Sequence, residues 1–191
     1  MKTLVLAVVA STLAAFSAAT LAEPETFTID PSHTYPHFEY NHLGYSNQNH
    51  RFEKTSGRIV FDRTAKTGSV DVSIDAESVA TGSRLFDRII QGPDFFDTAN
   101  HPTITFTSSS VRFDGDKPVA IEGSLTIKGV TKPVSLTVTN FNSMPHPMMN
   151  KDAIGGNAVT RIRRSEFNMG KYAPQVSDEG TLAIAVDAIK Y

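Results

Sequence analysis

Apolar and polar residues alternate with a period of two in several segments of the chain. The alternation is clear in residues 70–75, 103–107, 121–128, 134–139 and 181–187. A period of two gives a strand one apolar and one polar face, which is typical of antiparallel sheets with one buried side. Val, Ile and Thr, which favour strands over helices, are frequent in these segments. The pattern predicts an all-β protein, built as a sandwich or an up-and-down barrel.

Two segments interrupt the alternation. Residues 83–91 place Leu85 and Ile89 at helical spacing and end before Gly92-Pro93, a pair that stops helices. They predict a short helix of about two turns. Residues 141–157 contain three Met, two Pro and a Gly pair. We interpret this segment as a long loop, of the kind that often carries function.

The N-terminal segment differs in composition from the rest of the chain. A short basic start is followed by an almost wholly apolar run at 4–15 and by small residues up to Ala22. This order is the pattern of a cleavable secretory signal, and the apolar run is shorter than the ~20 residues of a membrane-spanning helix. We predict a signal peptide over residues 1–22, one barrel domain over residues 23–191, and a periplasmic or secreted protein. Cleavage after Ala19 and an uncleaved anchor are the alternatives.

Composition narrows the chemistry that the chain can perform. The chain has 191 residues, a formal net charge of −2 and no Cys. The lack of Cys excludes disulfides, Cys-ligated zinc, iron–sulfur clusters and thiol catalysis. The charge argues against a nucleic-acid partner, because such partners usually need a basic face. No Gly-x-Ser-x-Gly elbow, glycine-rich phosphate loop or His-Glu-x-x-His motif is present. We therefore predict no catalytic residues and a protein that is not an enzyme.

Several phrases, in order along the chain, resemble those of one family. They are Phe27-Thr-Ile-Asp-Pro-Ser-His33, Phe38-x-x-x-His42-x-Gly44, Gly92-Pro-Asp-Phe-Phe-Asp97, Pro102-x-Ile104-x-Phe106-x-Ser108, Gly123-Ser-Leu-Thr-Ile-Lys-Gly-Val-Thr-Lys-Pro-Val134, Arg164-x-x-Phe167-x-Met169 and Tyr172-x-Pro174-x-Val176-x-Asp178-Glu179. Together they resemble the YceI-like family of exported lipid-binding proteins over essentially all of residues 26–189. The resemblance implies a lipocalin-like, eight-stranded antiparallel β-barrel with a short helix against it.

The resemblance also implies that the barrel holds a long isoprenoid chain, either a polyprenyl lipid or an isoprenoid quinone. An eight-stranded barrel is just wide enough to be filled by its own side chains or to hold one ligand. Composition alone favours the filled core, and the resemblance is what favours a ligand. We expect a carrier or sequestration protein that needs no cofactor and makes transient contact with a membrane or membrane protein. The oligomeric state is left open.

The candidate ligand-binding residues are mostly aromatic or apolar. The three within residues 38–42 share one face of a strand. Arg161 and Arg163 share a face while Arg164 points the other way, and arginine forks suit a phosphate head group. A solvated strand face is the alternative interpretation of these arginines. The predicted set is Phe38, Tyr40, His42, Phe95, Phe96, Ile104, Phe106, Phe141, Phe167, Arg161 and Arg163.

Two groups of residues suggest metal chemistry as an alternative function. Zinc or another transition metal could be held by imidazoles and a carboxylate from the group His33, His37, Glu39, His42 and His50. Their spacing matches no familiar zinc pattern, and we predict no metal site there. Copper(I) favours the soft ligands offered by Met144, His146, Met148 and Met149. We prefer to interpret this second group as a flexible apolar lid over the barrel mouth.

Two further functions remain open at the level of sequence. An apolar tunnel discriminates poorly among lipophiles, so the protein could capture lipophilic antibiotics or toxins. A bound quinone would instead make it an accessory electron-transfer protein.

Overall fold

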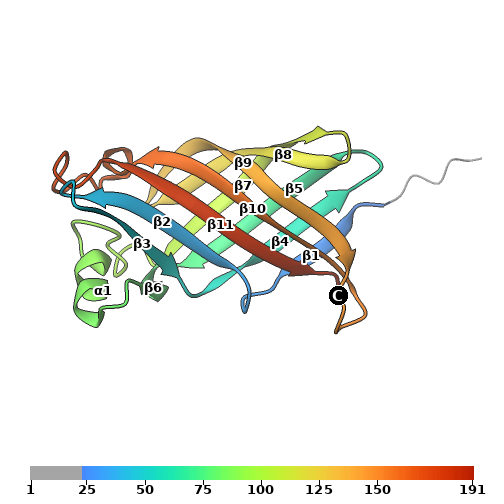
Figure 1. Cartoon of the computed structure of the whole chain (residues 1–191), viewed down its shortest axis with the longest axis horizontal. Helices are drawn as coiled ribbons and strands as arrows, with labels where there is room; N and C mark the ends of the chain where they lie inside the picture. Colours follow the sequence, from blue (N-terminus) through green and yellow to red (C-terminus); the bar gives the residue numbers. More distant parts are fainter. Residues whose placement is uncertain (1–22) are drawn as a thin grey trace, which may run out of the picture.

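The computed structural model describes residues 23–191, which form strands with one α-helix and two short 3₁₀ turns (Figure 1). The predicted signal peptide, residues 1–22, lies outside the described residues. The strands are β1 (Glu25–Ile29), β2 (Tyr35–His42), β3 (Ser46–Phe52), β4 (Thr55–Asp62), β5 (Thr67–Asp75), β6 (Val79–Ala80), β7 (Thr103–Asp114), β8 (Lys117–Ile127), β9 (Val130–Pro145), β10 (Asp152–Arg163) and β11 (Glu179–Ile189). The helix is α1 (Arg84–Gln91), and the 3₁₀ turns are η1 (Ala76–Ser78) and η2 (Arg164–Phe167).

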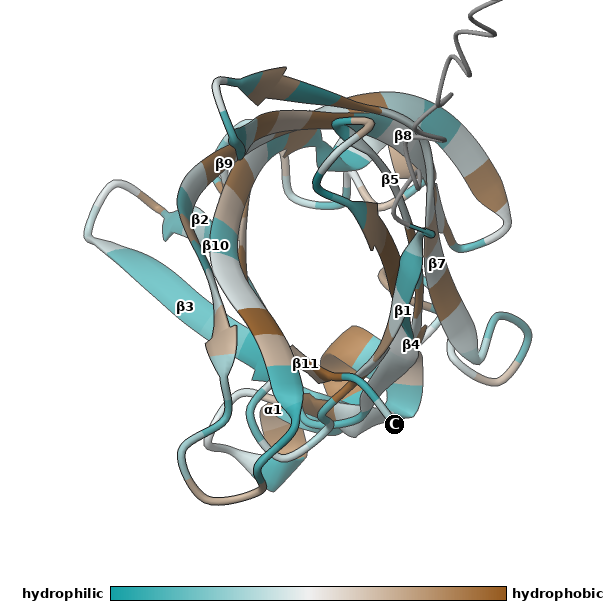
Figure 2. Cartoon of the chain, turned by 90° about the vertical axis from the view of Figure 1, so that its right-hand side faces the viewer, coloured by the Kyte–Doolittle hydropathy of each residue, from teal (hydrophilic) through white to brown (hydrophobic). Residues whose placement is uncertain are grey.

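Eight strands close into an antiparallel barrel, in the order β1-β4-β5-β7-β8-β9-β10-β11. The ring is completed by β1 and β11, where Thr28 lies opposite Ile189 and Ile29 opposite Ala188. Figure 2 looks along the barrel and shows the strands as a ring. Closure leaves these strands without a free edge. The structure therefore confirms the predicted all-β, lipocalin-like barrel.

Three strands lengthen the wall at one end of the barrel. Strand β11 pairs with β1 near its C-terminus and with β2 over Thr181–Ala185. Strand β2 continues to β3, and β3 to the two-residue strand β6. Figure 1 shows β2, β3, β6 and α1 together at the left end of the barrel, opposite the C-terminus.

The helix α1 is confirmed where the sequence predicts it. Its N-cap is Ser83, whose side chain accepts a hydrogen bond from the backbone N–H of Phe86, and Gly92 follows its last residue. The carboxylate of Asp87 accepts hydrogen bonds from both the backbone N–H and the hydroxyl of Thr81, each at 2.7 Å. These bonds fix the start of the helix to the segment that leads in from β6.

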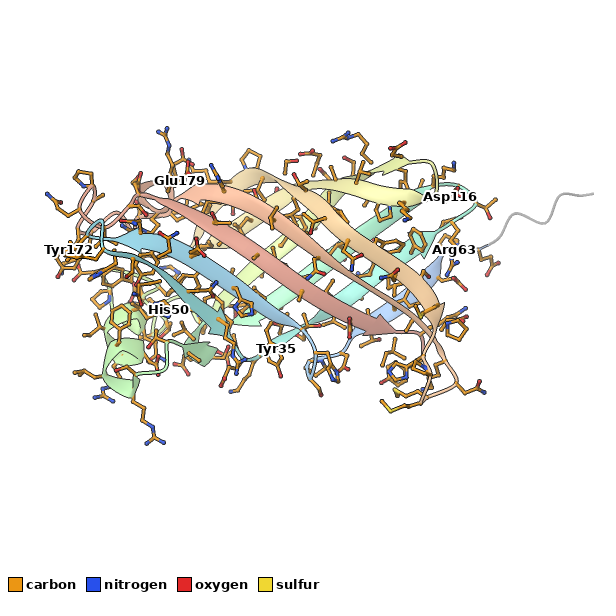
Figure 3. All side chains as sticks on the ribbon, viewed as in Figure 1. Tyr35, His50, Arg63, Asp116, Tyr172 and Glu179 are labelled. Atoms are coloured by element: carbon orange, nitrogen blue, oxygen red, sulfur yellow. The ribbon has the colours of Figure 1, made fainter. Side chains whose placement is uncertain are left out.

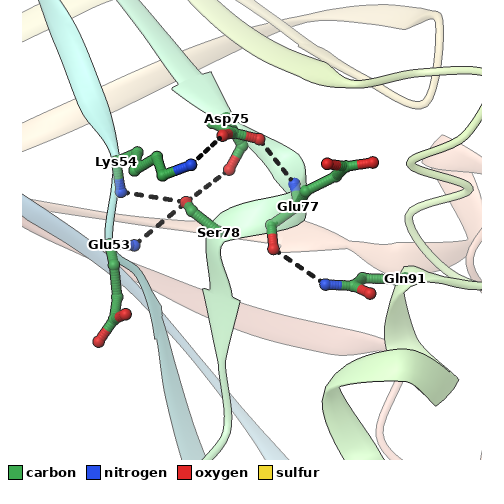
Figure 4. A network of polar contacts seen from close by, with 6 residues as sticks. All are labelled: Glu53, Lys54, Asp75, Glu77, Ser78 and Gln91. Carbon is green, nitrogen blue, oxygen red and sulfur yellow. Dashed lines mark hydrogen bonds and ion pairs between the residues drawn. The ribbon is translucent and has the colours of Figure 1, made fainter. Parts of the chain in front are cut away.

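A polar network fixes the other end of α1 to the barrel wall (Figure 4). The side-chain amide of Gln91 donates to the carbonyl oxygen of Glu77 in η1, at 2.9 Å. The hydroxyl of Ser78 accepts from the backbone N–H of Lys54 and donates to the carbonyl oxygen of Asp75. The helix is thus held beside the barrel end through η1.

The predicted loop over residues 141–157 is wrong. Strands β9 and β10 pair through most of it, with Phe141 opposite Gly156 and Pro145 opposite Asp152, so only a turn at 146–151 remains. Pro145 is tolerated because it is the last residue of its strand. The turn lies beside the C-terminus, where the backbone N–H of Lys190 donates to the carbonyl oxygen of Asp152. A lid formed by this turn over the α1 end is excluded by its position.

Two apolar clusters divide the barrel interior along its length. The larger lies toward α1 and includes Phe52, Ile90 and Phe167. The smaller, which we call the closed-end cluster, has Phe27, Ile29, Phe61, Ile154 and Ala188 as its buried members. Among residues 23–191, no helix is long and apolar enough to cross a membrane.

The close approach of β7 and β8 requires a residue without a side chain at Gly123. A Cβ atom there would lie 2.5 Å from Cζ of Phe106 and 2.6 Å from the carbonyl oxygen of Thr107. We expect Gly123→Ala to lower the free energy of unfolding by about 1–3 kcal/mol, because the backbone must shift. Urea unfolding measures this loss. Gly180→Ala is the matched control, since its Cβ would meet only the carbonyl oxygen of Glu39, at 3.5 Å. Equal midpoints for the two variants would contradict the crowding at Gly123.

Candidate ligand-binding site

The barrel encloses a cavity of about 300 Å³ that opens at the α1 end. Residues from ten strands and from α1 line it, and most of their side chains are apolar. Ile89 and Tyr172 belong to the lining and yet are 49% and 59% exposed, so they mark the mouth. Figure 3 shows Tyr172 at the same end as His50, with Arg63 and Asp116 at the other end. The volume falls at the lower end of the range for small-molecule pockets.

The cavity exists because the inward-facing side chains of several strands are small or aliphatic. On β11 these are Leu182, Ile184 and Val186, and on β10 Ala158. All four are only half-buried, because part of their surface faces the cavity rather than other side chains. The interpretation of the barrel as a core filled by phenyl rings is therefore wrong for this end of the barrel.

Seven of the eleven predicted site residues line the cavity. On β2, Phe38 and Tyr40 point inward and form part of an aromatic group with Phe52 and Phe96. Their contact with a ligand stays a prediction. The seven residues are Phe38, Tyr40, His42, Phe95, Phe96, Ile104 and Phe106.

The other four predicted residues lie outside the cavity, which corrects their placement in the sequence analysis. Arg161 and Arg163 are exposed on the outer face, and Arg161 pairs there with Glu179 at 3.3 Å. Phe167 is fully buried in the larger apolar cluster. Phe141 packs at the opposite end of the barrel, against Phe61.

Apart from Ile104, the sequence analysis missed the aliphatic part of the wall. Val134 and Leu136 on β9, with Leu182 and Ile184 on β11, line the cavity. The same period-two alternation that predicts these strands also identifies their inward faces, and that signal was sufficient to find them.

Near the mouth, the predicted residue Tyr40 is joined by His50, which the sequence analysis considered only as a metal ligand. The Tyr40 hydroxyl lies 3.2 Å from Nε2 of His50, while Nδ1 of His50 is buried without a hydrogen-bond partner. His50 is 6% exposed, and its ring packs edge-on against Phe38 and Phe86. Burial lowers the pKa of His50, opposed by the charge of Asp87, and burial raises the pKa of Tyr40. Both groups are therefore neutral near pH 7.

Arg164 also lines the cavity, and it faces opposite to Arg161 and Arg163. Its guanidinium donates to the backbone carbonyl oxygens of Met169, Val176 and Ser177 at 2.7–3.0 Å, and at longer range to that of Lys171. A guanidinium has five N–H donors, and these contacts occupy all of them. Burial lowers the pKa of Arg164, opposed chiefly by the carboxylate of Asp178. The side chain thus organises the loop beside the mouth.

The His and Glu residues considered for zinc binding do not come together. His33 pairs with Asp30, His37 with Asn49, and His50 with Tyr40. Among residues 23–191, no group of three or more His, Cys, Asp or Glu side chains is placed to hold a metal ion. In the Met-rich turn, Nδ1 of His146 accepts hydrogen bonds from the backbone N–H groups of Met148 and Met149. These two contacts hold the His146 ring inside the turn; binding of copper by the turn stays untested.

Known proteins resemble this chain in both sequence and structure. Residues 27–188 match the family described as YceI-like domain. Protein YceI of Escherichia coli O157:H7 is 35% identical over 159 residues, which cover 83% of this chain and 82% of that protein. The crystal structure of BcnA from Burkholderia cenocepacia matches with a TM-score of 0.70 at 27% identity, covering 84% of this chain and 99% of BcnA.

A further solved structure matches in fold. It is described as a polyisoprenoid binding domain from Saccharophagus degradans implicated in plant cell wall breakdown. It matches with a TM-score of 0.66 at 16% identity, over 86% of this chain and 98% of that one. The match of the family along nearly the whole described chain, the 35% identity to a protein of that name and the closed barrel agree with one another. This chain belongs to the YceI-like family.

Proposed function

We propose that this protein binds an isoprenoid lipid, with the hydrocarbon tail inside the barrel and the head group near the mouth. The observation that carries the proposal is an apolar cavity, open at one end, inside a barrel that its own side chains do not fill. The polyisoprenoid binding domain from Saccharophagus degradans, which has the same fold, supports the choice of ligand class. The role is binding rather than catalysis.

Burial of the tail accounts for useful affinity without any charged contact. A cavity of about 300 Å³ holds roughly 20–30 non-hydrogen atoms, at ~10–15 Å³ for each water-sized group. At about −0.3 kcal/mol per atom, such a ligand gains about −6 to −9 kcal/mol. This corresponds to a Kd on the order of micromolar.

The groups at the mouth favour a neutral head group over a phosphate. The Tyr40 hydroxyl and His50 are neutral near pH 7, because burial raises the pKa of Tyr40 and lowers the pKa of His50. All five N–H groups of Arg164 already donate to backbone carbonyl oxygens, so none is left for a phosphate oxygen. An alcohol or a quinone carbonyl needs only one such neutral partner. We therefore propose a prenol or an isoprenoid quinone as the ligand.

The proposed setting is the periplasm, where the protein carries or sequesters the lipid. The order of basic, apolar and small residues in 1–22 supports export. Leu85 and Ile89 of α1, together with Tyr172, expose apolar surface around the mouth. Such surface supports transient contact with a membrane during loading and release.

The central test is the lipid content of protein purified from the periplasm of cells that express the full chain. We expect organic extraction and mass spectrometry to yield an isoprenoid, and the intact mass to match residues 23–191. Ala158→Phe, which places a ring in the cavity, is expected to lose the lipid. Ala185→Phe is the control, because Ala185 lies on the neighbouring strand β11 but outside the cavity lining. Wild type without lipid, or equal lipid in both variants, would contradict the proposal.

The assignment of the head group predicts a small, selective effect of Tyr40→Phe. Loss of one hydrogen bond of about 0.5–1.5 kcal/mol weakens the binding of a prenol by roughly 2- to 12-fold. Isothermal titration measures the change, with a hydrocarbon of the same chain length as the control ligand. The hydrocarbon lacks a hydroxyl, and its affinity is expected to stay the same. A parallel loss for both ligands would show that Tyr40 acts only by packing.

The neutral state of His50 predicts a pH dependence of stability. The unfolded chain takes up a proton at His50 near its ordinary pKa of about 6.5, whereas the folded chain does so only at lower pH. The free energy of unfolding therefore falls as the pH drops below about 6.5, by at most ~1.4 kcal/mol per pH unit. Urea unfolding at several pH values measures the slope, and His50→Gln is expected to flatten it. His33, whose pair with Asp30 raises its pKa and gives the opposite slope, is present in both proteins. If wild type and His50→Gln show the same dependence of unfolding free energy on pH, the assignment of a lowered pKa to His50 is refuted.

A broader role in capturing lipophilic antibiotics or toxins uses the same cavity. Competition between such a compound and a bound prenol separates the two functions. Displacement of the prenol by a micromolar concentration of the compound would support the broader role.

A further inference from the structure

Three phenyl rings seal the end of the barrel opposite the mouth. The rings of Phe61 and Phe113 stack with centroids 5.9 Å apart, and the ring of Phe141 meets Phe61 edge-on at 5.4 Å. On the solvent side, the guanidinium of Arg63 lies 5.9 Å from the centre of the Phe61 ring and contacts the hydroxyl of Ser143. We call Phe61, Phe113 and Phe141 the phenyl plug.

The cavity ends where the phenyl plug begins. Ile29, Ile59 and Val186 belong to the closed-end cluster or pack against it, and all three also line the cavity. The plug residues belong to the same packing group, yet none of them lines the cavity. The apolar interior therefore continues through the barrel, and the plug divides it into a hollow part and a filled part.

Two β-bulges aim plug residues into the barrel. Phe106 and Phe113 are separated by an odd number of positions, so a regular strand would place them on opposite faces. Ser109 is an extra residue on β7, between the pairs Ser108–Gly123 and Ser110–Glu122, and it restores the inward direction of Phe113. Thr139 is likewise extra on β9, between the partners of Asn157 and Ala158, and it turns Phe141 inward.

We propose that the phenyl plug sets the greatest length of isoprenoid tail that the protein accepts. The hollow part holds roughly 20–30 non-hydrogen atoms, which is four to six isoprene units. A longer tail meets the plug and must leave the units next to its head group outside the mouth. Removal of one ring joins the hollow part to the space behind it and admits more of the tail. This inference rests on the proposed function, because it names the tail length for the same cavity.

The test is a competition among prenols of two, three, four, six and nine isoprene units, offered together and read by native mass spectrometry. Wild type is expected to select four to six units. Phe61→Ala, Phe113→Ala and Phe141→Ala are expected to raise the occupancy of the nine-unit prenol relative to the four-unit prenol. The increase is about tenfold or more, since burial of two further methylene groups already supplies that factor. Ile59→Phe extends the plug into the cavity and should shift selection to shorter prenols.

The controls separate the plug from general loosening of the core. Phe167→Ala removes a fully buried ring that does not line the cavity, and the prenol lengths that this variant selects should match those of wild type. Phe113 is half-buried, so its variant keeps the test available if Phe61→Ala fails to fold.

Each remaining outcome decides one of the two proposals. If wild type binds prenols and the plug variants select the same lengths, the plug inference is overturned and the proposed function stands. If wild type binds no prenol, the proposed function fails, and straight-chain alkanols then test the plug alone. If the plug variants bind longer alkanols than wild type does, the plug inference is supported. If the greatest alkanol length is unchanged, or no alkanol binds, the plug inference is overturned.

Discussion

Closure of the eight-stranded ring is the constraint on which the cavity depends. Protein interiors pack densely, and a void costs stability roughly in proportion to its size. An open sheet with such small inward side chains would bend until the void disappeared. Here each strand of the ring is hydrogen-bonded on both sides, with β1 and β11 completing the circuit. The number of strands therefore fixes the width of the interior, and Ala158 and Val186 cannot approach the opposite wall.

The same ring has two different ends because local elements modify it. At the α1 end, β2, β3 and β6 lengthen the wall, and the guanidinium of Arg164 ties down the loop beside the mouth through backbone carbonyl oxygens. At the other end, the bulges at Ser109 and Thr139 turn phenyl rings inward. One extra residue in a strand reverses the direction of every side chain beyond it. Two bulges are thus sufficient to give one barrel an open half and a filled half.

The sequence predicts those features that follow from local periodicity. Periodicity predicts the strands, the helix at 83–91 and the shared face of Phe38 and Tyr40. The structure confirms all of these and shows that this face points inward. Features that depend on register or on tertiary contacts were missed. The bulge at Thr139 hides the continuation of β9, so residues 141–157 resembled a loop. Arg161 and Arg163 share one face of β10, as predicted, but that face points outward and not into the barrel. The apolar Ile162 between them is buried and marks the inward direction. His50 lies in the polar run 46–51, which gives no sign that its ring is buried.

A smooth apolar interior gains free energy from buried area and has few means to recognise chemical pattern. In such a barrel, selectivity must arise where the interior stops being smooth. This chain has two such places: the neutral pair of Tyr40 and His50 near the mouth, and the phenyl rings at the far end. The first is placed to distinguish one head group from another, and the second to distinguish one tail length from another. Under the proposed function, the wall between them supplies affinity, while the two ends decide which isoprenoid is held.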